Sequence, residues 1–564
     1  MSPTPVMGTP STMGDDSQLT TTRLLLDAAR SHGDQMIAYR DEHDEWHETT
    51  YREVTRRALS ITAALQKLGF GPGHQVATML WNDLYHFESY FSIPASGATM
   101  VLINLRFRPD ELAYVINHAQ AEAIIVDAMF LPRVAEVKDE TPGLREAIVV
   151  GVFDRAEAEA ALPGVRIHAY EELVEDTEPA DPKDLPAMDE RSASGACFTT
   201  GTTGKPKGVF YSHRSVWLHA ASMATQIAVS ARTRMLLLTP MFHVQCWGVP
   251  YTAVMVGSVV LLPGRVHAAG MGDLARAAER YGATFAPAAP ALLFPMLHAM
   301  EDMEKAPDLS GMELICGAST PPLSLIERFH DVCGGEVIHA YGATETSPLV
   351  AINRTADHLT EGLSDEEILE LQVSPGSPAA GVDAKVVDDD GNELPWDGES
   401  TGELCFRGAW IASSYHDDEE ASATSFDEEG YWRSGDVGYF DKNGLMYITD
   451  RLKDVIKSGG EWISSIELEG SITHVPGVAA AAVIGIPHPH WEERPLALVE
   501  ARPGRDVSPE DVTAHLAKKF PQWQLPDDVL IVEEIARTSV GKMNKKALRE
   551  EYHNHYGADD QEPF

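Results

Sequence analysis

The regular alternation of short apolar runs with helix-like stretches constrains the fold of this 564-residue chain more than any other feature. Strand-like runs such as QVATML (75–80), TMVLIN (99–104) and AIIVD (123–127) are separated by stretches with helical periodicity. The same rhythm returns between residues 274 and 342. Strands that alternate with helices form parallel sheets with helical crossovers. The sequence therefore predicts an α/β N-terminal domain built from sheets of βαβ units.

The C-terminal part of the chain has a different character. From about Gly381 the strands become short, and Asp390-Gly391 and Asn443-Gly444 are typical hairpin turns. After residue 451 a compact α+β unit follows. Because 564 residues are too many for one compact core, we expect more than one domain. The predicted parts are a disordered tail at 1–20, a large N-terminal domain at 21–451 with a β-rich subdomain at about 381–449, and a small α+β C-terminal domain at 452–564.

The chain is strongly acidic, with 86 acidic and 44 basic residues and a net charge of −42. Nucleic acid and anionic membrane surfaces are poor partners for such a chain, because both are repelled by its field. The acids are scattered over the sequence, which is typical of salt-adapted proteins, where high salt screens the self-repulsion. An ordinary acidic protein from a low-salt organism is the alternative. Either way, anionic ligands require local cations.

The cysteines and the apolar runs indicate the cellular compartment in which the protein works. The five cysteines are far apart and form no CxxC pair, which argues against zinc sites and disulfide frameworks. No apolar run is long enough to span a bilayer, and the first residues lack the pattern of a secretory signal. We therefore expect a protein of the reducing cytoplasm, without a transmembrane segment.

Residues 199–208 read TTGTTGKPKG and follow an apolar run. Glycines allow the backbone to approach a polyphosphate, threonine hydroxyls donate hydrogen bonds, and the lysines supply charge. This is not the P-loop of kinases and ATPases, because Gly204-Lys205 is followed by Pro206 rather than by Ser or Thr. A flexible Gly/Thr linker is the alternative. The candidate phosphate-binding residues are Thr199, Thr200, Gly201, Thr202, Thr203, Gly204 and Lys205.

Four further motifs follow this loop in order. They are YGATETSP (341–348), YWRSGDVG (431–438), DRLKDVIKSGGEWIS (450–464) and RTSVGKMNK (537–545). Together the five motifs resemble the adenylate-forming superfamily of acyl-CoA synthetases, peptide-synthetase adenylation domains and beetle luciferases. The N-terminal third of the chain adds no motif.

The resemblance implies a fold and an activity. The fold is an N-terminal adenylation domain of sheets and helices with a mobile C-terminal lid domain. The activity is an AMP-forming acid:CoA ligase, which converts a carboxylic acid and ATP into acyl-AMP and pyrophosphate, and then into acyl-CoA and AMP. The implied cofactors and substrates are Mg²⁺, ATP and CoA, so the partners are small molecules. A homodimer is one assembly that the resemblance implies, and the oligomeric state stays open.

For the nucleotide, the resemblance implies that Tyr341 stacks on adenine, Thr344 contacts phosphate, and Glu345 coordinates Mg²⁺ together with Thr199. Mg²⁺ prefers one or two carboxylates plus phosphate oxygens, which suits Glu345. A solvated glutamate at a turn is the alternative. The resemblance also places in the ATP/AMP pocket Gly317, Ala318, His339, Ala340 and Gly342. For His339 and Ala340, a role in the core of a strand competes with this interpretation.

Asp436 resembles the ribose ligand of the family, because a carboxylate accepts hydrogen bonds from both ribose hydroxyls. Arg451 is similar to an arginine that touches ribose or phosphate. Lys542 resembles the lysine that stabilises the charge of the adenylation transition state. Without the neighbouring motifs, Asp436 would be interpreted as a turn residue and Lys542 as part of a solvated loop.

The segment after Asp450 is similar to the hinge of the family. The resemblance makes Lys453 the hinge residue, and it places Lys457, Gly460 and Trp462 in the conformation that accepts CoA. Hinges need a few residues that can absorb a change in φ and ψ, and the glycines of SGG offer that freedom.

The segment LTPMFHVQCWGVPYTAVMVGSVVLLPGR (238–265) carries the signal for the acid. The resemblance places His243 beside the substrate carboxylate at the end of a strand-like run. Trp247 resembles the tryptophan that gates the acyl tunnel of bacterial medium- and long-chain fatty acid ligases, so His243, Val244, Trp247 and Gly317 are the candidate acyl-pocket residues. No charged residue occurs between His243 and Arg265, which favours an apolar acid. A tryptophan that only packs in the core is the alternative.

Several functions compete at this point. A medium- or long-chain fatty acid:CoA ligase explains every motif. A ligase for a short thioether, aryl or branched acid, and an acyl-adenylating enzyme that serves a carrier protein, explain most of them. An adenylate-forming fold retained only for binding is disfavoured, because Glu345, Asp436 and Lys542 are all present.

Overall fold

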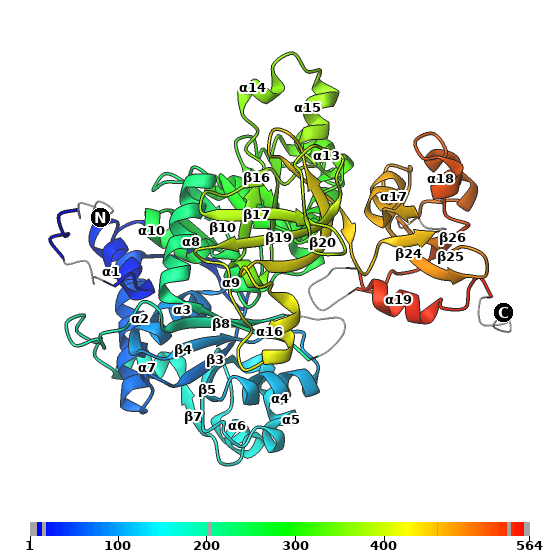
Figure 1. Ribbon diagram of the computed structural model, residues 1–564. Coiled ribbons are helices and arrows are strands. Elements are labelled where there is room, and N and C mark those ends of the chain that lie inside the picture. The colour runs from blue at the N-terminus through cyan, green and yellow to red at the C-terminus, as the bar shows by residue number, and fades with distance from the viewer. Residues whose placement is uncertain are drawn as a thin grey trace.

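The computed structural model describes residues 8–13, 18–199, 205–458, 461–502, 504–537 and 543–557. The N-terminal part holds two large sheets with helices and a smaller β-rich unit, and the C-terminal elements lie to one side of it after strand β21 (Figure 1). This is the predicted mixture of α/β and α+β architecture. Among the described residues, no helix is both long and apolar enough to cross a bilayer.

The first large sheet has seven strands in the order β7-β6-β5-β3-β4-β8-β9. All neighbours are parallel except the β8–β9 hairpin, whose connection is the candidate phosphate loop. Its strands are β3 (Gln75–Met79), β4 (Thr99–Leu102), β5 (Ala121–Asp127), β6 (Glu146–Val150), β7 (Arg166–Ala169), β8 (Ala193–Phe198) and β9 (Gly208–Ser212). The helices that accompany it in the chain are α2 (Tyr51–Lys67), α3 (Leu84–Ser96), α4 (Pro109–His118), α5 (Leu131–Glu136), α6 (Arg155–Ala161), α7 (Tyr170–Asp176) and α8 (His213–Gln226).

The second large sheet has nine strands in the order β16-β15-β14-β13-β12-β10-β11-β1-β2. Its centre is parallel, and both of its edges are antiparallel. Its strands are β1 (Met36–Arg40), β2 (Trp46–Thr50), β10 (Arg234–Leu236), β11 (Val259–Leu262), β12 (Phe285–Ala288), β13 (Glu313–Cys316), β14 (Glu336–Gly342), β15 (Leu349–Ile352) and β16 (Ser377–Pro378). The other helices of this part of the chain are α1 (Thr21–Ser31), α9 (Val244–Trp247), α10 (Val249–Val256), α11 (Met271–Tyr281), α12 (Pro290–Glu301), α13 (Leu323–Cys333), the 3₁₀ helix η4 (Thr344–Thr346), α14 (Asp357–Thr360) and α15 (Asp365–Leu371).

One hydrophobic core joins the two large sheets. It takes Val76 and Met100 from the first sheet, Ile37 and Met235 from the second, and apolar residues of several helices. Burial of this apolar surface is the main stabilising contribution, at about 25 cal/mol for each Å² removed from water. The two sheets therefore pack together in one N-terminal unit, which carries most of the candidate site residues.

A five-stranded antiparallel sheet spans residues 382–451, across the predicted β-rich stretch. The predicted turns lie at the β17–β18 and β20–β21 connections, where Gly391 and Gly444 have φ of 85° and 81°. The helix α16 (Glu419–Ser425) is an addition to the predicted strands. The strands are β17 (Val382–Val387), β18 (Glu393–Leu394), β19 (Gly402–Gly408), β20 (Trp432–Phe440) and β21 (Met446–Arg451).

The C-terminal α+β unit has its own cores around β24 and β25. The side chain of Lys545 is 11% exposed, with Nζ at 2.7 Å from Glu469 Oε1 and 2.6 Å from Ser465 Oγ, so this lysine stabilises the unit rather than a ligand. The elements are β22 (Ile456–Ser458), β23 (Glu461–Ile463), β24 (Val478–His488), β25 (Glu492–Ala501), β26 (Asp528–Val532), α17 (Ser465–Ile472), α18 (Pro509–Leu516) and α19 (Lys545–Glu551).

Candidate active site

Tyr341, Asp436 and Arg451 meet in one hydrogen-bonded group, although three different strands carry them. The register of the β20–β21 hairpin places Asp436 opposite Arg451, whose Nε lies 2.8 Å from Asp436 Oδ1. The Tyr341 hydroxyl of β14 donates to Asp436 Oδ2 at 2.5 Å. Each carboxylate oxygen has two acceptor positions, so Asp436 can still accept from the ribose hydroxyls of a nucleotide. The neighbouring Asp436 charge raises the pKa of Arg451, which keeps the guanidinium charged.

Glu345 lies in η4 directly after β14, and only 8% of its surface is exposed. The Tyr415 hydroxyl donates to its Oε1 at 2.5 Å. Burial raises the pKa of the Glu345 carboxyl, and the bond from Tyr415 with the nearby charges of Lys207 and Arg451 opposes that rise. The preceding Thr344 is also buried, and its carbonyl accepts a hydrogen bond from the Tyr211 hydroxyl at 2.7 Å. We refer to Tyr341, Glu345, Asp436 and Arg451 as the nucleotide side.

The candidate phosphate loop connects β8 to β9, and its two ends are paired. Thr199 N–H donates to the Lys207 carbonyl at 2.9 Å, and Lys207 N–H donates to Thr199 Oγ1 at 3.2 Å. The lysines lie over aromatic rings, with Lys205 Nζ at 5.0 Å from the centre of the Tyr114 ring and Lys207 Nζ at 4.6 Å from that of Tyr415. Thr200, Gly201, Thr202, Thr203 and Gly204 lie outside the described residues.

The remaining predicted pocket residues of β14 are held by the protein itself. His339 is buried, its Nδ1 lies 2.6 Å from the Val373 carbonyl oxygen, and burial lowers its pKa to about 4. Gly342 has to be a glycine, because a Cβ there would lie 1.7 Å from the Pro348 carbonyl oxygen. Ala318 has a left-handed φ of 72°.

Residues 244–248 form a left-handed turn that the sequence did not predict. Val244, Gln245, Cys246 and Trp247 have φ between 45° and 55°, and Gly248 follows at 70°. Such a conformation costs an L-residue about 1–2 kcal/mol, and strained residues of this kind cluster at functional sites. All five residues are buried in the core region between the two large sheets. The surrounding structure therefore enforces the turn.

Trp247 and Gly317 lie against each other. A Cβ on Gly317 would lie 3.2 Å from Trp247 Cη2 and 2.9 Å from the Ala340 carbonyl oxygen. Gly317 therefore separates the indole from the strand that carries Tyr341, and Val244 is buried nearby in the same turn. These contacts unite the predicted acyl-pocket residues with the nucleotide side. We refer to residues 243–248 with Gly317 as the acyl side.

His243 does not directly end a strand, which corrects the expectation from the sequence. Strand β10 ends at Leu236, and the chain then leaves the sheet before Pro240, whose ring nitrogen cannot donate to a strand ladder. His243 instead starts the left-handed turn, since its carbonyl accepts from Cys246 N–H at 3.0 Å. The side chain of His243 is half-buried.

His219 of α8 packs between the acyl side and strand β15. Its Nε2 accepts from Leu349 N–H at 3.2 Å, and its ring packs against Gly248, where a Cβ would lie 2.5 Å from the ring. The Trp410 ring lies edge-on to it at 6.2 Å, and Trp410 Nε1 donates to the Leu349 carbonyl at 2.9 Å. Burial lowers the pKa of His219 to about 3, so the ring is neutral and can accept.

The predicted hinge residues are only partly described. Lys453 follows β21 with an exposed side chain, and Lys457 lies exposed on β22, where its N–H donates to Glu493 Oε2 at 3.0 Å. Trp462 lies on β23, opposite Lys457 in the ladder. Gly460 and Lys542 lie outside the described residues.

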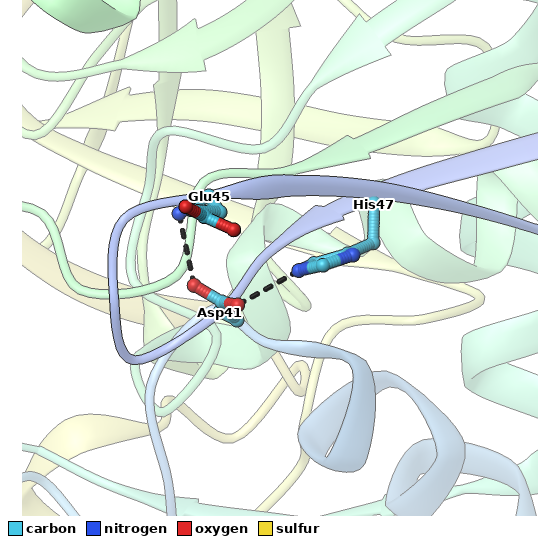
Figure 2. A group of neighbouring side chains, drawn as sticks. All are labelled: Asp41, Glu45 and His47. Atoms are coloured by element: carbon cyan, nitrogen blue, oxygen red, sulfur yellow. Dashed lines mark hydrogen bonds and ion pairs between the residues drawn. The ribbon is translucent and has the colours of Figure 1, made fainter.

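A separate group of metal-type ligands lies far from this site in sequence. Asp41, Glu45 and His47 surround the β1–β2 turn (Figure 2). Asp41 Oδ1 accepts from the N–H of Glu45 and of His43, both at 2.9 Å, and Oδ2 lies 2.7 Å from His47 Nε2. The carboxylate of Asp41 thus closes a turn.

Family models match both parts of the chain. The model of the AMP-binding enzyme matches residues 25–416, and the model of the AMP-binding enzyme C-terminal domain matches residues 467–542. The chain belongs to the AMP-binding enzyme family. The first match holds the phosphate loop, both sides of the site up to Glu345, and Tyr415.

Close relatives of this AMP-binding enzyme are CoA ligases. The chain is 42% identical to the long-chain-fatty-acid–CoA ligase of Thermus thermophilus, over 97% of this chain and 98% of the relative. It is 38% identical to the medium-chain-fatty-acid–CoA ligase of Ectopseudomonas oleovorans, over 95% and 96%. A 3-methylmercaptopropionyl-CoA ligase of Ruegeria lacuscaerulensis is also 38% identical, over 93% and 96%.

Solved structures agree with the fold. The anthranilate CoA ligase AuaEII in complex with anthranoyl-AMP has a TM-score of 0.83 at 23% identity, over 94% of this chain and 97% of that chain. The Mycobacterium tuberculosis fatty acyl CoA synthetase has a TM-score of 0.69 at 27% identity, over 96% and 100%.

Tyr415 contacts Glu345, Tyr211 contacts Thr344, and His219 packs against Gly248 beside Trp247. The sequence did not single out any of these three residues. In the sequence, Tyr415 precedes the acidic run HDDEE, and His219 lies in a helical stretch that carries no motif. Neither position has a spacing to the motifs that would have revealed it, because their contacts are made only in the tertiary structure.

Proposed function

We propose that this AMP-binding enzyme is an ATP-dependent acid:CoA ligase that acts on a medium- or long-chain fatty acid. A carboxylate oxygen of the acid attacks the α-phosphorus of ATP, and pyrophosphate leaves. The CoA thiol then loses its proton and attacks the acyl carbon, and AMP leaves. Acyl-CoA, AMP, pyrophosphate and the thiol proton released to solvent account for all atoms of the three substrates.

The contact of Trp247 and Ala340 with Gly317 carries this proposal. The acyl group and the adenylyl group have to meet for the reaction. Here the apolar indole of Trp247 lies on one side of Gly317, and β14, the strand that carries Tyr341, lies on the other. The sequence between His243 and Arg265, which begins with the turn of the acyl side, contains no charged residue. This composition suits an alkyl chain. Each buried methylene of such a chain contributes about 0.8 kcal/mol.

Adenylation requires charge neutralisation beside the nucleotide side, because the acid and ATP are both anions. Asp436 would hold the ribose and Tyr341 the adenine, while Lys205 and Lys207 face the phosphates. The buried carboxylate of Glu345 and the hydroxyl of Thr199 fit the oxygen ligands that Mg²⁺ prefers. Mg²⁺ bound there would neutralise phosphate charge. Lys542 is proposed to do the same for the attacking carboxylate.

The proposal extends to the C-terminal unit, where Lys453 would be the hinge and Lys457, Gly460 and Trp462 would serve the CoA step. The boundary near residue 451 belongs to this proposal. Salt adaptation, a cytoplasmic location and a homodimer stay predictions of the sequence.

A pyrophosphate-release assay with and without CoA tests the function. We expect acid-dependent pyrophosphate release, acyl-CoA formation only with CoA, and a rate that rises with chain length from acetate to a maximum among longer fatty acids. The panel includes 3-methylmercaptopropionate, because two Ruegeria relatives are named for that acid. Best activity with that short acid would refute the fatty acid assignment. Acid-dependent pyrophosphate release without formation of acyl-CoA in the presence of CoA would indicate a carrier-protein substrate.

A further inference from the structure

Residues 412–416 (ASSYH), which we call the strap, run between β19 and α16 and join two parts of the site. At one end, Ala412 N–H donates to the Glu345 carbonyl at 2.8 Å. At the other end, His416 N–H donates to the carbonyl of Gly208, the first residue of β9, at 2.9 Å. The strap therefore fixes the metal-ligand candidate relative to the end of the phosphate loop.

Tyr415 makes the side-chain contacts of the strap. Its side chain is 6% exposed, and its hydroxyl donates to Glu345 Oε1 at 2.5 Å. The Lys207 ammonium lies 4.6 Å from the centre of its ring. Phe426 packs edge-on against that ring with centres 5.7 Å apart, and Ser422 Oγ accepts from Tyr415 N–H at 2.9 Å. The helix α16 and the residue that follows it thus hold the ring in one place.

Among the described residues, Tyr415 is the side chain that donates to Glu345. A carboxylate with one oxygen held by a fixed donor has a defined orientation, and its remaining lone pairs can still bind a metal. Groups that orient a ligating carboxylate in this way control metal affinity, and their loss costs about 10–100-fold. The ring face at the same time attracts the Lys207 ammonium.

We propose that Tyr415 is a positioning residue for acid adenylation, which aligns Glu345 for Mg²⁺ through its hydroxyl and holds Lys207 of the phosphate loop through its ring. The inference rests on the proposed function, because it assigns Tyr415 to the adenylation half of the ligase reaction. It makes the strap a link between the groups that meet the metal and the groups that meet the phosphates.

The variant Tyr415→Phe removes the hydroxyl and keeps the ring. We expect the Mg²⁺ concentration for half-maximal pyrophosphate release to rise about tenfold. Conversion of supplied acyl-adenylate and CoA to acyl-CoA, which needs no phosphate-bound metal, stays at the wild-type rate and shows that the variant is folded. A binding readout accompanies the rates: the Mg²⁺-dependent rise in Tm with a non-hydrolysable ATP analogue moves to about tenfold higher Mg²⁺.

The chain offers a matched control in Tyr170→Phe. The Tyr170 hydroxyl also donates to a buried glutamate, Glu88 Oε2, at 2.8 Å, and both side chains are at most 1% exposed. This variant loses the same kind of bond outside the site. We expect it to lower Tm and to leave the Mg²⁺ midpoint at the wild-type value.

The variant Tyr415→Leu tests the ring separately. It removes the π-face as well as the hydroxyl, so we expect weaker binding of the ATP analogue even without Mg²⁺, by about threefold, whereas Tyr415→Phe binds it as the wild type does. If Tyr415→Phe and wild type share one Mg²⁺ midpoint in both readouts, the proposal is overturned. A wild type that releases no pyrophosphate with any acid instead refutes the proposed function, and the Tm titration then still decides the role of Tyr415.

Discussion

The nucleotide side and the acyl side of this site are built in opposite ways. On the nucleotide side, ordinary strands and one 3₁₀ turn carry Tyr341, Glu345 and Asp436, and hydrogen bonds between protein groups fix each polar side chain. On the acyl side, a left-handed turn at 244–248 carries an indole that meets Gly317 through van der Waals contact. Directional bonds suit a substrate that never changes, whereas apolar contact can be altered to suit different acids.

The largest effect is expected where the directional bonds are removed. In Asp436→Ala, the proposed ribose ligand is lost and Arg451 loses the carboxylate that faces it. Hydrogen bonds to a charged group contribute about 1.5–3 kcal/mol each, so loss of the bonds from both ribose hydroxyls should lower kcat/KM for ATP about 10²–10⁴-fold for every acid, as steady-state kinetics will show.

The control for that variant is Asp427→Ala, which breaks an ion pair with Lys385 of the same five-stranded sheet, where the charged atoms are 2.8 Å apart. We expect a lower Tm with an unchanged KM for ATP. An Asp436→Ala effect that varies strongly from one acid to another would contradict a nucleotide side that is independent of the acid.

His219, which packs against Gly248 of the acyl side, gives a smaller effect that tests whether its ring is buried in the neutral form. Its folded-state pKa of about 3 lies below the ordinary value of 6.5, because burial disfavours the charged ring. Between these values the unfolded chain binds a proton that the folded protein excludes, so wild type loses about 1.4 kcal/mol of stability per pH unit as pH falls below 6.5. His219→Gln lacks this loss.

Denaturant unfolding from pH 7.5 to 5 measures the prediction. The stability difference between wild type and His219→Gln should be constant above about pH 6.5 and should shift in favour of the variant below it. The control is His43→Gln, since the His43 side chain is 78% exposed. A gap between wild type and His219→Gln that does not change with pH would refute a neutral, buried His219.

The sequence revealed much of the nucleotide side and little of the acyl side, for physical reasons. Asp436, Glu345 and Tyr341 stand in motifs whose spacing is typical of adenylate-forming enzymes. The left-handed turn could not be predicted, because Val244 and Trp247 normally avoid positive φ and only tertiary packing forces it. Tyr415 reaches Glu345 across 70 residues, a contact that no local pattern encodes.

The two sheets followed from the alternation of apolar runs, because that pattern depends on local periodicity and burial. Their order did not, since strands such as β1 and β11 become neighbours although they are distant in the chain. The prediction that His243 ends a strand was wrong for a similar reason. The apolar sequence around His243 is typical of a strand, but β10 ends at Leu236 and the chain then enters the left-handed turn.

The central claim, an acyl side that selects the acid beside a nucleotide side that does not, is tested most directly by the chain-length profile of Trp247→Ala. kcat/KM is measured from acetate to long-chain fatty acids, together with the Kd for ATP. We predict that the optimum moves to longer or bulkier acids, that short acids react less well, and that the Kd for ATP does not change. The indole lies against Gly317, whereas Asp436 is held by Tyr341 and Arg451 and Glu345 is held by Tyr415. A loss of the same factor for every acid, or a weakened Kd for ATP, would contradict the account.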